Sequence, residues 1–282
     1  MIVFVNVRQN FERHIDKFAK YCYYIHKFEQ GSTQMSYKQR SIQIIDYLKE
    51  HKTATVEQLA HLLYVSEATV RRDLSEMQKS GQIERSHGGA VLTEGSDELS
   101  IYIRQTKNAK EKMKTVSIAL KHLPDFQTVF IDNSSTCLAL VERMSFAHKT
   151  VVTNGLQIAL HVSRHDDVTL IIPGGQIKNY STAVTGGMAL AALNDFRFDL
   201  ALLSCAAVDD AGSYELALDS MLIKRAAIAK SKQSVLIFDK TKTNTHSPFL
   251  TTPLDSFSML ISDASDEELT QLRTVHDCVY NK

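Results

Sequence analysis

Residues 54–92 read ATVEQLAHLLYVSEATVRRDLSEMQKSGQIERSHGGAVL, and the order of elements in this stretch decides the fold of the N-terminal part of the chain. Thr55 precedes one segment with apolar residues at helical spacing, and Ser66 precedes a second, so both stand where helix N-caps are expected. Tyr64 and Val65 leave only a tight connection between the two predicted helices. Two short helices joined by about three residues, the second with arginines on its outer face, are typical of a helix-turn-helix.

The segments on either side complete a predicted DNA-binding module over residues 36–92. Residues 36–51 place apolar side chains on one side and charged ones on the other, which predicts an amphipathic helix. Gly81 is expected to end the second helix of the motif, because glycine adopts the left-handed conformation of a helix end at little conformational cost. Residues 82–92 then alternate apolar and polar around a Gly-Gly pair, which predicts a small β-hairpin, or wing.

Seven side chains of this module are candidates for contact with double-stranded DNA. The second helix has to fit the major groove, with its exposed N-terminal side chains reaching base edges. Arginine can take guanine in a bidentate pair, whereas Ser and Thr more often position the helix on phosphate. The wing is expected along the DNA backbone. The candidates are Ser66, Glu67, Thr69, Arg71 and Arg72 on the helix, and Arg85 and His87 on the wing.

Charge gives little support to this interpretation. Residues 36–92 contain eight Lys or Arg and seven Asp or Glu, so an amphipathic helical segment with a solvated charged face would have a similar composition. The fixed order of helix, turn, helix and wing is therefore the observation that favours DNA binding.

The same stretch resembles the signature of the DeoR family of transcriptional regulators. Val65-Ser66, the TVRRDL segment at 69–74 and the RSHGGA segment at 85–90 match the family's pattern in its fixed order. The resemblance implies a sequence-specific regulator that binds an operator and forms a homo-oligomer. We expect a repressor of a carbohydrate-metabolism operon.

The composition sets broad limits on function and location. The 282 residues suggest two domains, and 32 Lys and Arg balance 32 Asp and Glu, so DNA affinity has to come from a local basic patch. No apolar run approaches the roughly 20 residues that span a bilayer. Four distant cysteines match no metal-ligand or disulfide pattern. We expect a cytoplasmic protein with reduced cysteines and without a metal, a cofactor or a membrane partner; the cysteines are Cys22, Cys137, Cys205 and Cys278.

Two segments fall outside the predicted domains. Residues 1–34 are denser in aromatic residues than the rest of the chain and are interpreted as an N-terminal extension or a mis-called start, because Met35 opens a segment like an ordinary protein start. Residues 93–100, TEGSDELS, are polar and contain a glycine, so they are interpreted as a linker.

From residue 101 onward, short apolar runs alternate with helical segments. The runs are rich in Val, Ile and Leu, as buried parallel strands are. This alternation predicts an α/β domain with a mostly parallel sheet over residues 101–282. The runs are 128–132, 150–154, 168–175, 200–206, 234–239 and 258–263, and the helical stretches are 109–122, 135–145, 155–163, 185–194, 217–231 and 265–273.

The residues that follow these runs predict a ligand site, because ligands of such sheets bind at the carboxyl ends of the strands. Hydroxyls and free N–H groups ahead of a helix suit an anion, and glycines let the backbone approach a ligand closely. Taken singly, Ser134 is an ordinary N-cap and Lys242 an ordinary surface charge. Together they predict a phosphate held beside a polyol. The candidates are Asp132, Ser134, Ser135, Thr136, Thr153, Asn154, Gly174, Gly175 and Lys242.

This half of the chain also resembles the DeoR-family sensor domain, whose fold is similar to ribose-5-phosphate isomerase and CoA-transferase domains. The resemblance covers roughly residues 101–263 and adds Lys224, in a K-R-A helix, to the effector-binding candidates. Arg104 and Lys112 belong to a further matching pattern before the first strand of the sheet. The family's G-A-D-G-like turn is replaced here by 204–209, SCAAVD, without its acid or its glycines.

The altered turn bears on the function. In isomerase-like relatives an acid at this turn helps proton transfer, so its loss argues against an enzyme and leaves no catalytic residue to assign. We therefore favour a regulator whose DNA binding responds to a phosphorylated sugar or a related small anion. The alternatives are a regulator with a ligand-free sensor domain and a sugar-phosphate isomerase-like enzyme.

Overall fold

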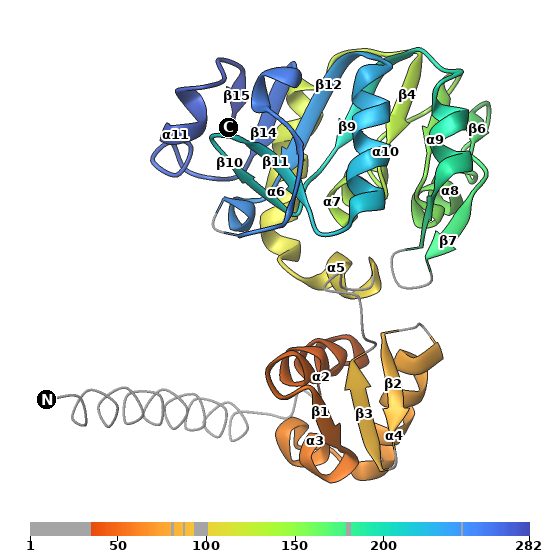
Figure 1. Cartoon of the computed structure of the whole chain (residues 1–282), viewed down its shortest axis with the longest axis vertical. Helices are drawn as coiled ribbons and strands as arrows, with labels where there is room; N and C mark the ends of the chain where they lie inside the picture. Colours follow the sequence, from red (N-terminus) through yellow and green to blue (C-terminus); the bar gives the residue numbers. More distant parts are fainter. Residues whose placement is uncertain (1–34, 80–81, 87, 93–100, 179–181, 244) are drawn as a thin grey trace, which may run out of the picture. The chain divides into compact units, whose positions relative to one another are not determined.

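The computed structural model describes residues 35–79, 82–86, 88–92, 101–178, 182–243 and 245–282 (Figure 1). The predictions made for residues 1–34, Gly81, His87 and the 93–100 linker lie outside the described residues.

The N-terminal unit is the predicted winged helix-turn-helix. It contains helices α2 (Tyr37–His51), α3 (Val56–Leu63) and α4 (Glu67–Lys79). Strands β1 (Thr53–Thr55), β3 (Gly89–Leu92) and β2 (Ile83–Ser86) form an antiparallel sheet in that spatial order. The apolar residues that predicted the helices are buried, among them Ile44, Leu48, Leu59, Leu63, Val70, Leu74 and Met77.

Side-chain N-caps set where the two helices of the motif begin, as predicted for Thr55 and Ser66. Thr55 Oγ1 accepts a hydrogen bond from the Gln58 amide at 3.1 Å, and the Gln58 side chain accepts one from the Thr55 amide at 2.9 Å. This reciprocal pair is a capping box. Ser66 Oγ accepts from the Thr69 amide at 3.2 Å, ahead of α4. The caps fix where each helix begins and therefore which α4 side chains point outward.

The sensor unit is built on a seven-stranded parallel sheet with the spatial order β15-β14-β12-β9-β4-β5-β6. All six predicted apolar runs are confirmed as strands of this sheet. The strands are β4 (Thr128–Ile131), β5 (Thr150–Thr153), β6 (Thr169–Ile171), β9 (Phe198–Leu203), β12 (Ser231–Phe238) and β14 (Met259–Ser262), with the short β15 (Val279–Tyr280) at one edge.

Helices cover both faces of the sheet, so each central strand is buried on two sides. Along β4, Val129 and Ile131 pack into one apolar cluster, whereas Phe130 packs into the other. The first cluster includes side chains of α6 (Ala109–His122), α7 (Ser135–Val141) and α8 (Leu156–Val162); the second includes those of α9 (Gly187–Leu193) and α10 (Leu218–Ala229) (Figure 1). This burial explains the continuous apolar runs in the sequence.

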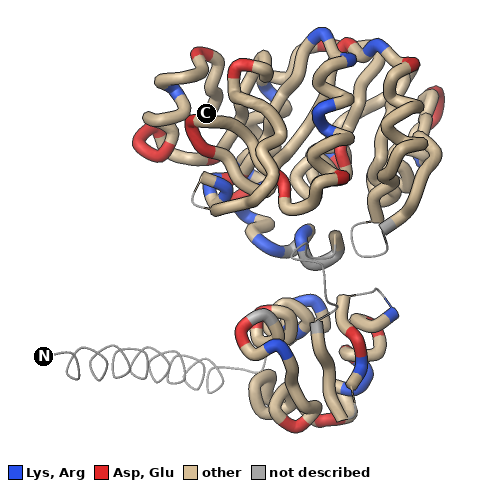
Figure 2. The backbone as a smooth tube through the Cα atoms, viewed as in Figure 1, with Lys and Arg blue, Asp and Glu red and all other residues tan. Residues whose placement is uncertain are grey.

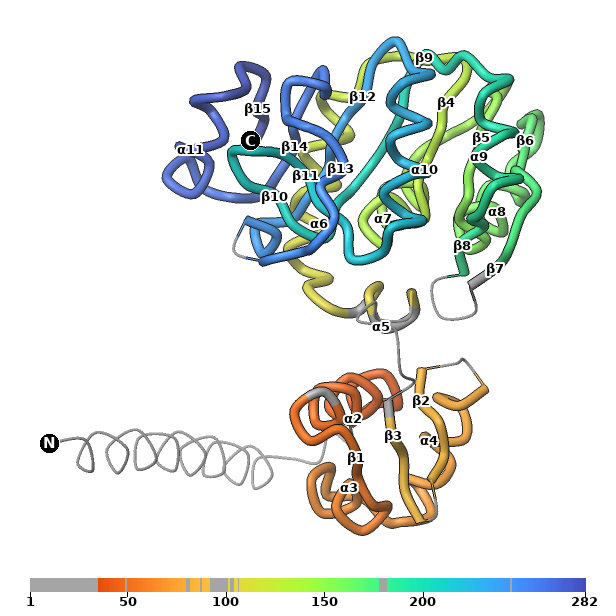
Figure 3. Tube along the Cα trace, viewed as in Figure 1, coloured from red at the N-terminus to blue at the C-terminus, as the bar shows by residue number. Residues whose placement is uncertain are grey.

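The order of the strands creates a switch point between β4 and β9. From β4 the chain moves outward through β5 to β6, and β9 then returns to the other side of β4 (Figure 3). The connections that leave β4 and β9 therefore diverge at the carboxyl edge of the sheet. In open α/β sheets this divergence is where ligands bind.

The sequence did not predict the smaller elements. β7 (Gln176–Lys178) and β8 (Ala183–Thr185) form a hairpin, and β10 (Ala207–Asp209), β11 (Gly212–Glu215) and β13 (Phe249–Thr252) form a separate antiparallel sheet. These strands have three or four residues each, too few for a clear alternation. Short helical segments complete the unit: α5 (Ile101–Thr106), η1 (Lys240–Lys242) and η2 (Leu254–Ser256).

The helix predicted over residues 265–273 was too long. Only α11 (Thr270–Arg273) is α-helical, because Ser265 and Glu268 close a turn on each other: the Ser265 amide donates to the Glu268 carboxylate at 2.7 Å and the Glu268 amide to Ser265 Oγ at 3.2 Å. Within the described residues, no helix is long and apolar enough to cross a membrane.

Candidate functional sites

Helix α4 presents a polar surface opposite its buried side. Val70, Leu74 and Met77 are buried, whereas Arg71 and Arg72 are exposed. Arg71 forms an ion pair with Glu67 one turn earlier, at 2.7 Å, in which both side chains are about half exposed. Such a pair contributes only a few tenths of a kcal/mol, so either partner can leave it for a stronger contact.

Ser66 and Thr69 lie together at the start of α4. Their hydroxyl oxygens are 3.0 Å apart, and Ser66 Oγ is occupied as the helix cap. The helix start thus depends on the same side chain that was predicted to contact DNA. The DNA contacts of both residues stay predictions.

Arg85 on β2 is directed at α4. Its Nη1 lies 3.4 Å from the Arg71 carbonyl and 3.5 Å from Ser75 Oγ. Strand β2 is therefore tied to α4 through a charged side chain at its centre. Arg85 was predicted to run along the DNA backbone; this arrangement gives it a part in holding the wing on the helix as well.

In the sensor unit, Asp132 lies at the switch point between β4 and β9. Its carboxylate is fully buried and accepts hydrogen bonds from the amides of Ser134, at 3.0 Å, and Ser204, at 2.9 Å. Lys224 Nζ, from α10, lies 3.0 Å from the same carboxylate. One aspartate thus joins the residues that follow two diverging strands to a helix on one face of the sheet.

Lys224 is bound on three sides. Besides Asp132 it contacts the Glu215 carboxylate and donates to the Ser204 carbonyl at 2.6 Å. The three charged side chains, Asp132, Glu215 and Lys224, are called the switch-point triad below. All three are buried, and together they carry a net charge of −1 when ionised.

The pKa values of Asp132 and Lys224 favour the ionised forms of both groups at neutral pH. Burial alone would raise the pKa of Asp132, but the Lys224 ammonium and the hydrogen bonds from Ser134 and Ser204 outweigh it and lower that pKa. Burial would lower the pKa of Lys224, but the carboxylates of Asp132 and Glu215 outweigh it and raise that pKa. Each charge is stabilised by its neighbours.

Glu215 is the member of the triad that the sequence analysis missed. The expected acid at the turn after β9 is absent, but the β10–β11 hairpin returns the chain so that Glu215, on β11, reaches Lys224. Ala207 pairs with Tyr214 in this hairpin. Strands of three and four residues gave no sequence pattern from which this return was predictable.

The ends of β4, β5 and the β7–β8 hairpin come together beside the triad. Ser134 caps α7 by accepting from the Cys137 amide at 3.1 Å. Asn154 donates to the Val184 carbonyl at 3.3 Å, which ties β5 to β8. Residue 155, which follows Asn154, has to be a glycine, because a Cβ there would lie only 2.9 Å from Asn133 Cα. The sequence-predicted strand ends therefore do converge.

Several buried polar atoms in this region have no partner among the described residues. They are Asn133 Nδ2, Asn154 Oδ1 and Thr185 Oγ1, on three different segments. Leaving a buried polar group unsatisfied costs about 1–3 kcal/mol. An amide donor, an amide acceptor and a hydroxyl in this state together suit a ligand with several hydroxyl groups.

Thr153 has a structural role, and its predicted contact with the effector stays a prediction. Its hydroxyl donates to the Ile131 carbonyl at 2.7 Å and accepts from the Gly155 amide at 3.1 Å, so it holds the end of β5 against β4. Gly175 is required by the fold, because its φ is +156° and a Cβ there would lie 2.5 Å from the Thr185 carbonyl oxygen; its close approach to a ligand stays a prediction. Gly174 is exposed next to it.

Positive charges gather between the start of α6 and η1 (Figure 2). Lys112 is buried and contacts the carbonyls of Arg104 and Lys107, the second at 2.7 Å. Burial and the charges of Lys242, Arg104 and Lys107 lower the pKa of Lys112 to about 8, although Asp239 opposes them. We call Lys112, Lys242, Lys107 and Arg104 the cation cluster. Lys112 was noted in the sequence only through the family pattern.

Asp239 connects the cation cluster to the sheet. It follows β12 directly, is fully buried, and accepts from the Thr241 amide at 3.1 Å. Its second oxygen, Oδ2, has no partner among the described residues. Asn108 donates to Thr241 Oγ1 at 2.8 Å and so ties the start of α6 to η1. This places Lys112 and Lys242 on neighbouring segments.

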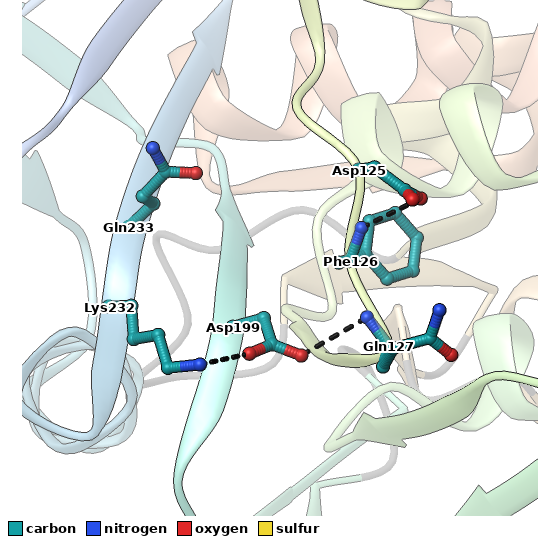
Figure 4. Close-up of a pocket in the computed structure, with 6 residues that line it drawn as sticks. All are labelled: Asp125, Phe126, Gln127, Asp199, Lys232 and Gln233. Atoms are coloured by element: carbon teal, nitrogen blue, oxygen red, sulfur yellow. Dashed lines mark hydrogen bonds and ion pairs between the residues drawn. The ribbon is translucent and has the colours of Figure 1, made fainter.

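A hollow lies at the amino-terminal edge of the sheet, opposite the triad (Figure 4). Asp199 lines it and accepts hydrogen bonds from Lys232 Nζ at 2.7 Å and from the amides of Gln127 and Thr128 at 3.1 and 3.0 Å. These bonds lower the pKa of Asp199 to about 2. Because the Asp199 carboxylate is held by these three bonds, it joins the starts of β4, β9 and β12 at this edge.

Comparison with known families agrees with both halves of the chain. The DeoR-like helix-turn-helix domain model matches residues 40–95, and the DeoR C terminal sensor domain model matches residues 107–264. The chain belongs to the DeoR family of transcriptional regulators.

Curated relatives cover most of the chain. The L-fucose operon activator of Escherichia coli (strain K12) is 31% identical over 229 residues, which are 78% of this chain and 92% of the relative. The glycerol-3-phosphate regulon repressor of the same strain is 29% identical over 210 residues, 74% of this chain and 83% of the relative. Both relatives are named as regulators, in agreement with the membership of this chain in a family of transcriptional regulators with a helix-turn-helix domain.

Among solved structures, D-ribose-5-phosphate isomerase in complex with phospho-erythronic acid covers 48% of this chain and 54% of its own, at 13% identity and a TM-score of 0.36. That score is too low to support a comparison of sites.

Removing the cation of the switch-point triad should destabilise the sensor unit strongly. Lys224→Met leaves Asp132 and Glu215 buried without their partner, which should cost about 3–5 kcal/mol at pH 7 in urea unfolding of the full chain. The matched control is Lys232→Met, which removes only the ion pair between the exposed Lys232 and Asp199. It should lower the free energy of unfolding by less than about 1 kcal/mol.

The Lys224→Met loss should also depend on pH with a definite sign. The folded pKa of Asp132 is depressed, so its stabilisation is present above the unfolded pKa of about 3.9 and is lost as pH falls through the folded value. The difference between Lys224→Met and the unsubstituted chain should therefore shrink below about pH 4. Equal losses of unfolding free energy in Lys224→Met and Lys232→Met would contradict the role of the triad. A difference between Lys224→Met and the unsubstituted chain that does not change with pH would contradict it as well.

Proposed function

We propose that this DeoR-family regulator is a repressor of a carbohydrate-metabolism operon, released from its operator by a phosphorylated sugar. The observation that carries the proposal is the meeting, at one edge of the sensor sheet, of a cation cluster and several buried polar atoms without partners. One end of that edge suits a phosphate, and the other suits hydroxyl groups.

The charges at this edge predict how the effector lies. The switch-point triad has a net charge of −1 when ionised and disfavours a phosphate beside Asp132 and Glu215. Lys112 and Lys242 attract one, and the Ser135 and Thr136 side chains are available as hydrogen-bond donors. We therefore place the phosphate near η1 and the start of α7, and the polyol toward Asn133, Asn154 and Thr185. Lys224 then acts by positioning Asp132 and the residues after β4.

In the DNA-binding unit we propose that α4 enters the major groove. Arg72 is exposed on the outer side of the helix and is the candidate for a base edge, whereas Ser66 and Thr69 at the helix start suit phosphate. The exposed Glu67 and Arg71 can exchange their mutual ion pair for DNA contacts. We also propose a homo-oligomer, since paired recognition helices would read two half-sites.

The names of the relatives agree with this proposal in part. One is a repressor of a glycerol-3-phosphate regulon, which supports a phosphorylated small molecule as the signal. Another is an activator, so the direction of regulation needs its own test. A reporter fused to the promoter of the gene that encodes this chain should show higher expression when that gene is deleted. Lower expression would mean that the protein is an activator.

Effector binding can change transcription only through a difference in affinity between states of the protein. A ligand that binds equally well to the DNA-competent and DNA-incompetent states shifts neither population. The proposal therefore requires that the phosphorylated sugar bind more tightly to the state with low operator affinity.

Arg72→Ala should weaken binding to an operator fragment while effector binding stays unchanged. A bidentate contact to a base is worth about 1–3 kcal/mol, or roughly 5- to 150-fold in the dissociation constant measured by fluorescence anisotropy. Lys79→Ala, at the exposed end of the same helix, is the matched control and should change affinity by less than about threefold. Operator affinity unchanged by Arg72→Ala would remove the proposed contact.

Thr136→Ala combined with Lys242→Ala should abolish the response to effector while DNA binding persists. The double substitution removes a hydroxyl donor and a cation from the proposed phosphate position. A panel of sugar phosphates would be screened by thermal shift on the unsubstituted chain, and the best ligand used in operator-release titrations. Lys121→Ala, exposed at the far end of α6, is the control. A normal response in the double variant, or no stabilisation by any sugar phosphate, would contradict the site.

A further inference from the structure

The ammonium of Lys112, on α6, holds the end of α5, which is the first helix of the sensor unit. Its Nζ donates to the Arg104 carbonyl and, at 2.7 Å, to the Lys107 carbonyl. Arg104 lies in the last turn of α5, where backbone carbonyls have no partner within the helix. A helix of six residues has little stability of its own, so the buried ammonium fixes where α5 ends.

Both of these partners of Lys112 are uncharged. Among the residues that the structure describes, no carboxylate forms an ion pair with its ammonium. Carbonyl oxygens replace the hydration of a buried cation but not its counter-ion, so burial of the charge is incompletely compensated. The charge of Asp239 offsets this cost only in part, since the pKa of Lys112 is still lowered to about 8. An anion that reaches Lys112 would therefore be bound strongly.

The ammonium also has a donor to offer to such an anion. It carries three N–H groups, and the two carbonyls at the end of α5 take two of them. Lys242, the other lysine proposed for the phosphate, belongs to a different segment: it lies on η1, and its amide donates to the Asp239 carbonyl at 3.0 Å. A phosphate between the two lysines would be tied to α5 through Lys112 and to the end of β12 through Lys242.

We propose that Lys112 couples the effector to the segment that leads to the DNA-binding unit, by donating at the same time to the effector phosphate and to the carbonyls at the end of α5. The inference rests on the proposed phosphate position and adds a route from it to residues 93–100, which directly precede α5 in the sequence. Helix α5 also packs against α7, whose first residues carry the hydroxyls proposed for the same phosphate. Binding of the phosphate thus holds α5 in place.

The coupling requires two states of α5. In the docked state, seen here, α5 is bound to Lys112 and packs against α7. In the released state the ammonium is solvated, and the six residues of α5 lengthen the connection between the two units. The phosphate favours the docked state, because only there do Lys112 and Lys242 face it together, and a ligand shifts an equilibrium only by such a difference in affinity. The docked state is then the one with low operator affinity.

The first test measures the coupling factor, which is the ratio of the effector dissociation constants with and without a saturating promoter fragment. The ligand is the sugar phosphate selected by thermal shift, titrated calorimetrically into the full chain. Lys112→Met should weaken effector binding about tenfold, because a hydrogen bond to a charged group is lost. Its coupling factor should fall to within about twofold of 1, because the phosphate no longer holds α5.

The matched control is Lys242→Met, which removes the same charge from the cation cluster but is not bound to α5. It should weaken effector binding by a similar factor and keep the coupling factor of the unsubstituted chain. A residue that only attracts the phosphate would behave like Lys242, so the two variants separate coupling from affinity.

Hydrogen exchange followed by mass spectrometry gives a second readout, which needs neither DNA nor a substitution. Saturating sugar phosphate should slow exchange of the peptide that covers residues 101–107 by about threefold or more in the unsubstituted chain, because docking protects the amides of α5. A peptide that covers α11 should exchange at the same rate with and without the ligand. In Lys112→Met, saturated with the same ligand, exchange over residues 101–107 should not slow.

The outcomes distinguish this inference from the proposed function. If the sugar phosphate binds but exchange over residues 101–107 does not slow in the unsubstituted chain, coupling through Lys112 is refuted, even where Lys112→Met fails to fold. A full coupling factor in Lys112→Met would refute it as well. In both cases the proposed function stands. If no sugar phosphate binds the unsubstituted chain, the proposed function itself is overturned, and the coupling with it.

Discussion

The ammonium of Lys224 is the interaction on which the sensor unit depends. It pairs with two buried carboxylates, Asp132 after β4 and Glu215 on β11. Because all three groups are buried, water cannot replace the ammonium as the partner of these carboxylates. Through Asp132 it also fixes the amides of Ser134 and Ser204, where the chain leaves the two strands of the switch point. The carboxyl edge of the sheet is thus built around a charge network before any ligand arrives.

The hydrogen bonds and ion pairs of this network separate the neighbouring residues that hold the strand ends in place from those that carry polar atoms without a partner. The charged groups of the triad satisfy each other, and Thr153 holds the end of β5 against β4 through the Ile131 carbonyl. In contrast, Asn133, Asn154 and Thr185 carry atoms with no partner among the described residues. The cation cluster beyond Asp239 supplies charge of the opposite sign. A small anionic polyol is the chemical class that would satisfy both sets of groups at once.

Local signals were sufficient for most of the fold. Each central strand is buried on two faces and so appears as a run of Val, Ile and Leu, and Thr55 and Ser66 marked helix starts that the caps confirm. The site was predicted less completely. Glu215 depends on a hairpin of three- and four-residue strands, the bond from Thr153 to the Ile131 carbonyl links two strands, and the direction of Arg85 toward α4 is a tertiary contact. Such placements arise from packing between segments that no local pattern specifies.

The proposed binding of DNA by α4 and of a phosphorylated sugar by the sensor unit have to be coupled, and a measurement of linkage tests that coupling directly. Isothermal titration of the best sugar phosphate into the full chain, with and without a saturating promoter fragment, gives the two effector affinities. The account predicts weaker effector binding in the presence of DNA, by the same factor by which the effector weakens DNA binding. Equal effector affinity with and without DNA would contradict it.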